Sequence, residues 1–285
     1  MLNEHQEQSA SHGAVAIQAN GNVTFNGLGL VEVRELCTLF LRDNFPRLRE
    51  EARLIAEERV AQFASHLEAK LADNVNSIVI EKFRDPDVQT AINDAVQACA
   101  RKGDAAHPNI LANLILKKVS ANSNDFKDIV MSEAVQVTPK LTREQIAFLA
   151  FVLVMQLYVF PGTSWESVER SFQSVEKVAA SGFGISDIQR RHIHYSGAAS
   201  VAGRNAVHPT YDMFDAMQQK YAPYGLHSFK SVMSEKTPTL VKLIGEYGKA
   251  QGDAVALTSV GVAIAVAYLS SFGFPDLDLL TETQA

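Results

Sequence analysis

The sequence predicts a mostly α-helical fold, a multi-helix, bundle-like body preceded by an N-terminal β-hairpin. Three observations predict it: apolar residues recur at threes and fours over most of the chain, helix-start signals recur along it, and strand-like alternation is confined to a short stretch near the N-terminus. The 285 residues are 47% hydrophobic. That is enough apolar material for the core of one large or two small domains.

The first 27 residues divide into a tail and a hairpin. Residues 1–13 are polar without apolar periodicity, and we expect them to be disordered. In residues 14–27, Asn20-Gly21 lies between two alternating segments, which is the strongest short signal for a β-hairpin. A lone hairpin is marginally stable in water, so we expect this one to mediate homo-oligomerisation. The apolar residues that would do so are Val15, Ile17, Val23 and Phe25.

Helical spacing begins after Gly29. We expect one helix over residues 30–43 and a second that begins at Pro46, because proline suits the first helical position. The second helix, to Asn74, is densely charged and carries one narrow apolar stripe. Its members are Leu48, Ala52, Ile55, Ala56, Val60, Phe63, Leu67 and Leu71. Such a stripe suits a helical hairpin or an oligomer seam, and the charged residues suit a solvated face.

The rest of residues 28–180 reads as a helical domain. Asp85-Pro86 is a cap followed by proline, and Thr142 with Gln145 and Thr163 with Glu166 match the capping-box pattern. Helices are expected over residues 86–103, 108–121, 125–137, 142–160 and 163–180.

Residues 181–285 form a second helical portion that we expect to pack on the first. Residues 196–206 are small and polar and are expected to be irregular. Helices are expected over residues 210–221, 226–234, 239–250 and 253–272.

Two stretches, residues 145–165 and 254–275, contain no charged residue, and each is about as long as the ~20 residues that span a bilayer core. Asp253 and Asp276 bound the second stretch, which therefore lacks the basic flanks of a membrane helix. The mean hydropathy of the chain is −0.02. We interpret both stretches as buried core helices, and a membrane-inserting segment at 254–275 is the alternative.

Charge and cysteine content restrict the function classes. With 26 basic and 32 acidic residues the formal net charge is −6, which argues against a generally basic nucleic-acid-binding surface. Two cysteines cannot form a disulfide framework or a four-cysteine zinc site. The polar N-terminus does not match a signal peptide, so a cytoplasmic location is expected.

The sequence matches none of the phosphate-binding, dinucleotide-binding, nucleophile-elbow or zinc-protease motifs, so no cofactor is indicated. One polar cluster, residues 187–195, is a candidate site. In an extended segment His192 and His194 would face the same way and could bind a metal, whereas in a helix they would diverge. Arg190 and Arg191 could contact an anion or a partner's carboxylate. The alternative is a surface segment at the end of a helix.

Several short motifs are spread over most of the chain. They are residues 17–23, 33–36, 44–52, 83–87, 100–104, 132–134, 139–142 and 259–265. In these motifs the chain resembles an uncharacterised bacterial protein family whose name is built from Legionella and Veillonella locus tags. The resemblance implies no established activity and supplies no site residues.

The favoured hypothesis is a non-enzymatic, self-assembling helical scaffold or sensor that binds itself and another protein, one encoded nearby, in a bacterial antiviral or stress-defence setting. The first alternative is a membrane-acting effector that uses residues 254–275. The second is an enzyme with an unrecognised site near His192 and His194.

Overall fold

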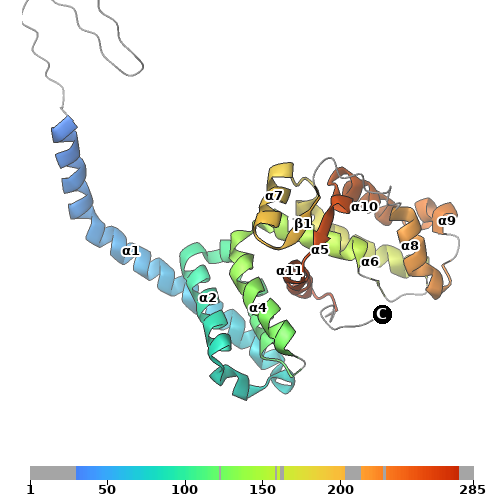
Figure 1. Ribbon diagram of the computed structural model, residues 1–285, viewed down its shortest axis with the longest axis horizontal. Coiled ribbons are helices and arrows are strands. Elements are labelled where there is room, and N and C mark those ends of the chain that lie inside the picture. Colours follow the sequence, from blue (N-terminus) through green and yellow to red (C-terminus); the bar gives the residue numbers. More distant parts are fainter. Residues whose placement is uncertain are drawn as a thin grey trace, which may run out of the picture. The chain divides into compact units, whose positions relative to one another are not determined.

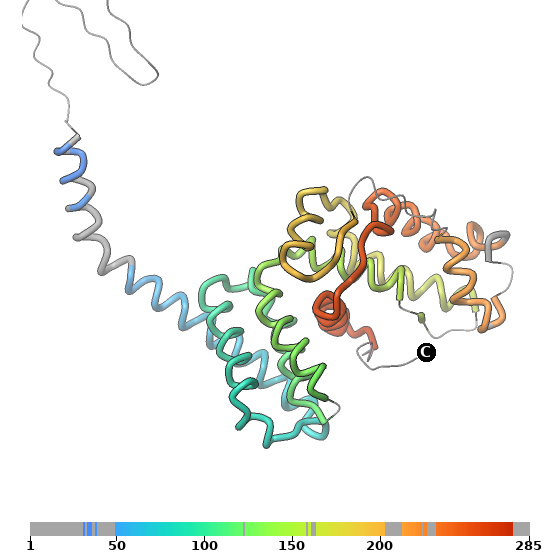
Figure 2. Tube along the Cα trace, viewed as in Figure 1, coloured from blue at the N-terminus to red at the C-terminus, as the bar shows by residue number. Residues whose placement is uncertain are grey.

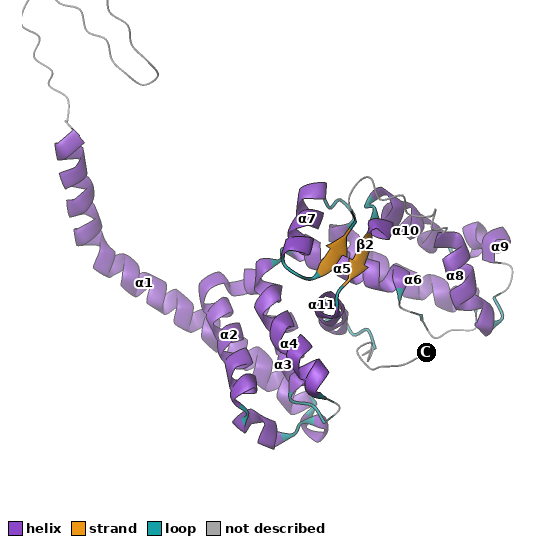
Figure 3. Cartoon of the chain, in the orientation of Figure 1, coloured by secondary structure: helices purple, strands orange, loops and turns teal. Residues whose placement is uncertain are grey.

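The computed structural model describes residues 30–121, 123–157, 159–160, 164–202, 213–226 and 229–275. The tail of residues 1–13 and the hairpin of residues 14–27, with Val15, Ile17, Val23 and Phe25, lie outside these ranges. The described residues form α-helices joined by short 3-10 turns, with a small two-stranded sheet (Figures 1 and 3). The mostly α fold class is confirmed.

The α-helices are α1 (Leu30–Asp73), α2 (Pro86–Lys102), α3 (Pro108–Lys118), α4 (Asp125–Val137), α5 (Arg143–Gln156), α6 (Trp165–Ala179), α7 (Asp187–Tyr195), α8 (Met213–Tyr221), α9 (Phe229–Lys236), α10 (Pro238–Lys249) and α11 (Ser259–Ser270). The strands are β1 (Ala199–Val201) and β2 (Val255–Leu257). The 3-10 turns are η1 (Val75–Ser77), η2 (Ile80–Arg84), η3 (Gly103–Ala106), η4 (Thr138–Lys140), η5 (Ala180–Gly182), η6 (Ala222–Tyr224) and η7 (Gly252–Ala254).

The chain divides into two compact units, residues 1–52 and 53–285, and helix α1 contributes to both. The described part of the first unit is the helical stretch 30–52, on which Val31 and Val33 are exposed. All other elements belong to the second unit.

The expected break before Pro46 is wrong, because α1 is one continuous helix. An internal proline removes one backbone hydrogen bond, and the turns on both sides nevertheless keep helical geometry. The expected apolar stripe is confirmed where α1 meets the second unit's core, at buried Phe63 and half-buried Leu67. Farther toward the N-terminus, Leu54 and Ile55 are exposed.

Local capping explains where α2, α4 and α5 begin. The Asp85 side chain accepts a hydrogen bond from the Asp87 backbone N–H at 2.8 Å, and Asn124 accepts one from Lys127 N–H at 2.9 Å. Thr142 and Gln145 form the expected capping box. These side chains satisfy backbone donors that the first turn of a helix leaves free.

Helices α5 and α11 lie at the centre of the second unit. Residues 145–155 of α5 and 260–269 of α11 are all buried. Helix α11 packs against α3, α4 and α5, as the trace in Figure 2 shows. A Cβ on Gly261 would lie 1.9 Å from the Ala198 carbonyl oxygen, so glycine lets the start of α11 approach the backbone before β1.

The expected single helix over residues 253–272 is wrong. Residues 252–254 form η7, β2 follows, and Thr258 then caps α11. Strand β2 pairs antiparallel with β1, with Ala256 opposite Ser200. Residues 199–201 therefore form a strand, and the expectation that they are irregular is wrong.

The helices of the described ranges are all too short or too polar to cross a membrane.

Helices α6 and α10 pack together beside α5. The cap of α6 is Ser164, which accepts from Ser167 N–H at 3.2 Å, whereas the expected cap Thr163 lies outside the described residues. The Glu169 carboxylate of α6 accepts hydrogen bonds from the backbone N–H and the hydroxyl of Thr239, and it thereby caps the start of α10.

Candidate functional site

The candidate metal ligands His192 and His194 lie on helix α7, not on an extended segment. Two residues along a helix are about 200° apart around its axis, so the two rings diverge. His192 Nδ1 lies 3.0 Å from Gln145 Nε2 on α5, and His194 Nδ1 accepts from Val201 N–H at 3.3 Å. The structure therefore directs the two imidazoles to different elements. The described ranges hold no cluster of three or more His, Cys, Asp or Glu that could bind a metal.

Arg190 is buried and its guanidinium is used inside the chain. It donates to the Ala250 carbonyl at 3.1 Å, the Ile185 carbonyl at 3.3 Å and Gln251 Oε1 at 2.9 Å. Ala250 follows the last residue of α10, where helix carbonyls lack intrahelical partners. Arg190 therefore ties α7 to the end of α10. Arg191 is exposed and pairs with Asp187 at 3.1 Å.

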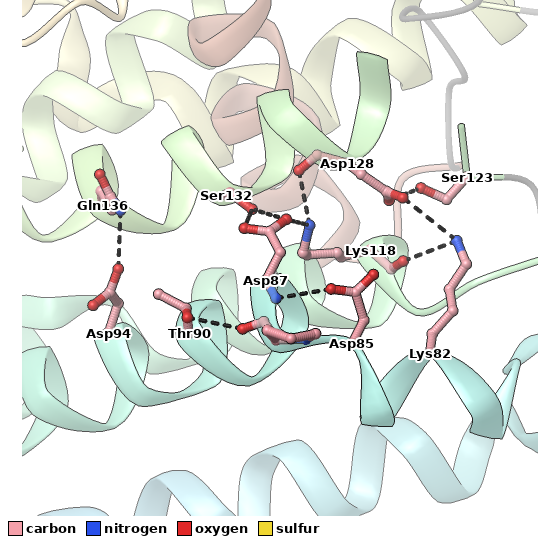
Figure 4. Close-up of polar contacts among 11 residues, drawn as sticks. Lys82, Asp85, Asp87, Thr90, Asp94, Lys118, Ser123, Asp128, Ser132 and Gln136 are labelled. Carbon is pink, nitrogen blue, oxygen red and sulfur yellow. Dashed lines mark hydrogen bonds and ion pairs between the residues drawn. The ribbon is translucent and has the colours of Figure 1, made fainter. Parts of the chain in front are cut away.

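A second polar cluster, which the sequence did not predict, is centred on Lys118 at the end of α3 (Figure 4). The residue is 1% exposed. Its ammonium donates to Asp87 Oδ2 at 2.5 Å and to the Asp128 carbonyl at 3.0 Å. The hydrogen bond from Lys118 holds the pKa of the Asp87 carboxyl below its usual range. Ser132 on α4 donates to the same carboxylate at 3.1 Å.

The edge of this cluster reaches η2. Lys82 Nζ donates to the Lys118 carbonyl at 3.3 Å and lies 3.8 Å from Asp128 Oδ2, as Figure 4 shows. The Ser123 hydroxyl donates to the same Asp128 carboxylate. These contacts fix η2 to the junction of α3 and α4. Partners more than thirty residues apart in sequence carry no local signal, so sequence patterns could not show them.

Beside η2 lies an apolar groove with a volume of about 600 Å³. One wall is the C-terminal part of α1 and the other is residues 75–83. Its lining is apolar except for Glu68: Ala64, Leu67, Glu68, Leu71, Ala72, Val75, Ile78, Ile80 and Phe83. Val75 is 65% and Ile80 is 74% exposed.

The groove is built on fixed backbone. Ile78 forms a β-bridge with Ser120, and Val79 N–H donates to the Val119 carbonyl at 2.9 Å. The apolar stripe predicted from the sequence contains Leu67 and Leu71 of the α1 wall, whereas the opposite wall was not predicted. The available signal was the short apolar run Ile78-Val79-Ile80, with Phe83 nearby, just after the helix. A preformed, open, apolar groove can bury apolar side chains of a macromolecule.

Comparison with known proteins identifies the family to which the chain belongs. The sequence profile of an uncharacterised family named after a Veillonella locus tag matches residues 27–223. No curated protein and no solved structure matches the chain. The matched residues run from before α1 into η6 and include both walls of the groove and the Lys118 cluster. Because the match covers more than half of the 285 residues, the chain belongs to this family.

Proposed function

We propose that this protein is a non-enzymatic, self-assembling helical scaffold that binds another macromolecule. The observation that carries the proposal is the exposed apolar surface of the second unit, which consists of Leu54 and Ile55 on α1 and the groove at the C-terminal end of that helix. In the first unit, Val31 and Val33 are exposed as well. Apolar surface that leaves water contributes about 25 cal/mol per Å², so this surface favours association.

The contacts of the buried polar side chains support a structural role. Arg190 donates to the carbonyl of Ala250, which follows the last turn of α10, and Lys118 donates to the Asp128 carbonyl of α4. Gln156 on α5 donates to the Tyr247 hydroxyl and to the Val255 carbonyl, each at 2.8 Å. Each of these side chains connects elements of the fold.

Light scattering at micromolar concentration tests self-assembly. We expect the full chain to be a dimer to tetramer, and a Leu54→Glu, Ile55→Glu variant to have a smaller mass with unchanged helical circular dichroism. Deletion of residues 1–27, which contain the predicted hairpin, should also give a smaller, folded species. A monomeric full chain contradicts the proposal, and a deletion variant with the full oligomeric mass shows that residues 1–27 are not responsible.

The second macromolecule is expected to be a protein encoded beside this chain and acting with it in the cytoplasm, in a stress or antiviral response. Coexpression with each neighbouring gene product, followed by size-exclusion chromatography, tests this. Co-elution of one product at fixed stoichiometry is the expected result. Independent elution of all neighbouring products contradicts it.

A further inference from the structure

We infer that the groove between α1 and residues 75–83 is a two-fold symmetric interface, in which it pairs with the same groove on a second copy of this chain. The inference rests on the proposed self-assembly and names the surface and the partner. Three features of the groove carry it: shape, charge and rigidity.

The shape is self-complementary. Val75 and Ile80 line the groove and remain exposed, so one patch supplies both an apolar hollow and exposed apolar side chains. An isologous interface needs both features on one patch, because each copy must supply what the other receives. In two copies related by a two-fold axis, these side chains of each copy can enter the groove of the other.

Opposite charges are also available at the two walls. Glu68 lies on the α1 wall, and exposed Arg84 directly follows Phe83 on the opposite wall. Among the described residues, neither side chain is held in an ion pair. A two-fold axis parallel to the groove places the α1 wall of one copy against the Arg84 wall of the other, so two Glu68–Arg84 pairs form. Glu81 also lies on this second wall. Lys82 of the same wall already pairs with Asp128 within its own chain.

The walls are held before any partner binds. The Ile78–Ser120 bridge, the Val79–Val119 hydrogen bond and the Lys82 contacts fix residues 78–82 to the end of α3. A preorganised surface loses less conformational entropy on association than a mobile one. The groove is therefore suited to a stable contact between folded copies.

Charge reversal in the full-length protein gives a direct test. In Glu68→Arg and in Arg84→Glu, each two-fold interface would contain two like-charge contacts, and we expect the dissociation constant of either variant to rise about tenfold or more. An equimolar mixture of the two variants should recover the wild-type association, because the mixed pair contains two opposite-charge contacts. Glu133→Arg on the exposed face of α4 is the charge-matched control and should not change association. Sedimentation velocity over a concentration series measures all four.

The apolar contribution is tested in the same way. Ile80→Glu should weaken association, whereas Ile188→Glu, at an equally exposed position on α7, should not. Circular dichroism confirms that each variant is folded, as expected for exposed positions. Unchanged dissociation constants for Glu68→Arg, Arg84→Glu and Ile80→Glu overturn the inference, and so does a mixture that fails to recover association. If the full chain is an oligomer but these variants keep its mass, only the inferred surface is wrong; a monomeric full chain overturns the proposed function as well.

Discussion

At the scale of single residues, buried polar groups hold distant parts of the chain together. Lys118 has a buried ammonium that is tolerated because Asp87 supplies a counter-charge and Asp128 a carbonyl. Removing one partner of a buried pair is usually more destabilising than the pair is stabilising, because a charge is left without compensation. The sequence shows that these residues exist, but their separation along the chain hides the pairing.

We predict that Asp87→Asn lowers the free energy of unfolding at neutral pH by about 1–2 kcal/mol, at the low end for a buried pair because Asp87 itself is half exposed. The folded-state pKa of Asp87 lies below its usual value of 3.8. Its stabilising contribution is therefore present above pH 3.8 and is lost as the pH falls through the folded-state pKa. Urea unfolding should show the difference between wild type and variant shrinking in acid. Asp94→Asn on the same helix replaces a partly exposed carboxylate by an amide whose oxygen can still accept from Gln136, so it should change the free energy by less than about 0.5 kcal/mol.

Lys220 on α8 gives a prediction at alkaline pH. Its ammonium donates to the Met155 carbonyl at 2.7 Å near the end of α5, and burial lowers its pKa from 10.5 to about 8. Between these two values the unfolded chain binds more protons than the folded chain, so stability rises with pH. Wild type should gain about 2 kcal/mol relative to Lys220→Met between pH 7.5 and 9.5, on the order set by 1.36 kcal/mol per pKa unit. Parallel urea midpoints for the two proteins over this range would contradict the shift.

At the scale of elements, sequence patterns predicted the starts of α2 and α5 but not the start at Pro46 or the structure of the apolar segment 253–272. The Thr142–Gln145 capping box and Asp85-Pro86 each act within one turn, so local sequence is sufficient to place them. Residues 253–272 read as one helix because Val, Ala and Leu are compatible with strand and helix alike. Pairing of β2 with β1, more than fifty residues earlier, decides the outcome, and no local pattern reports that pairing.

A pair of glycine substitutions tests the contact between α11 and the segment before β1. Gly261→Ala places a Cβ against the Ala198 carbonyl, and backbone cannot move aside as a flexible side chain can. We expect a loss of about 2 kcal/mol or more, the range for overpacking in a core. Gly245→Ala in α10 meets no atom within 4 Å and should gain about 0.5–1 kcal/mol from helix propensity. Thermal unfolding of the two variants should move in opposite directions, and a neutral Gly261→Ala would show that the contact yields.

At the scale of the whole molecule, the chain divides into two compact units after residue 52. The sequence predicted the charged helix but not that its apolar stripe would be divided between a buried and an exposed part. The stripe is continuous in sequence. Phe63 is buried because the core of the second unit packs against it, whereas Leu54 and Ile55 are exposed.

Two truncated fragments therefore test which part of α1 the second unit needs in order to fold. A fragment of residues 53–285 keeps Phe63 in the core and the hydrogen bond from Arg59 to the Arg101 carbonyl, and it should unfold cooperatively at a temperature close to that of the full chain. A fragment of residues 75–285 lacks both contacts and should be less stable, by the roughly 3–5 kcal/mol typical of losing a buried phenylalanine. Equal unfolding temperatures for the two fragments would contradict the role of α1 in the core.

The only tryptophan of the chain, Trp165, is the first residue of α6 and packs against the core of the second unit. Intrinsic fluorescence excited selectively at the indole therefore reports on that unit alone. Circular dichroism, by contrast, sums over every helix, including residues 30–52 of α1. If those residues melt separately, ellipticity will change at a lower temperature than the tryptophan emission does. The interval between the two transitions then measures, without any added label, how independently the N-terminal part of α1 unfolds.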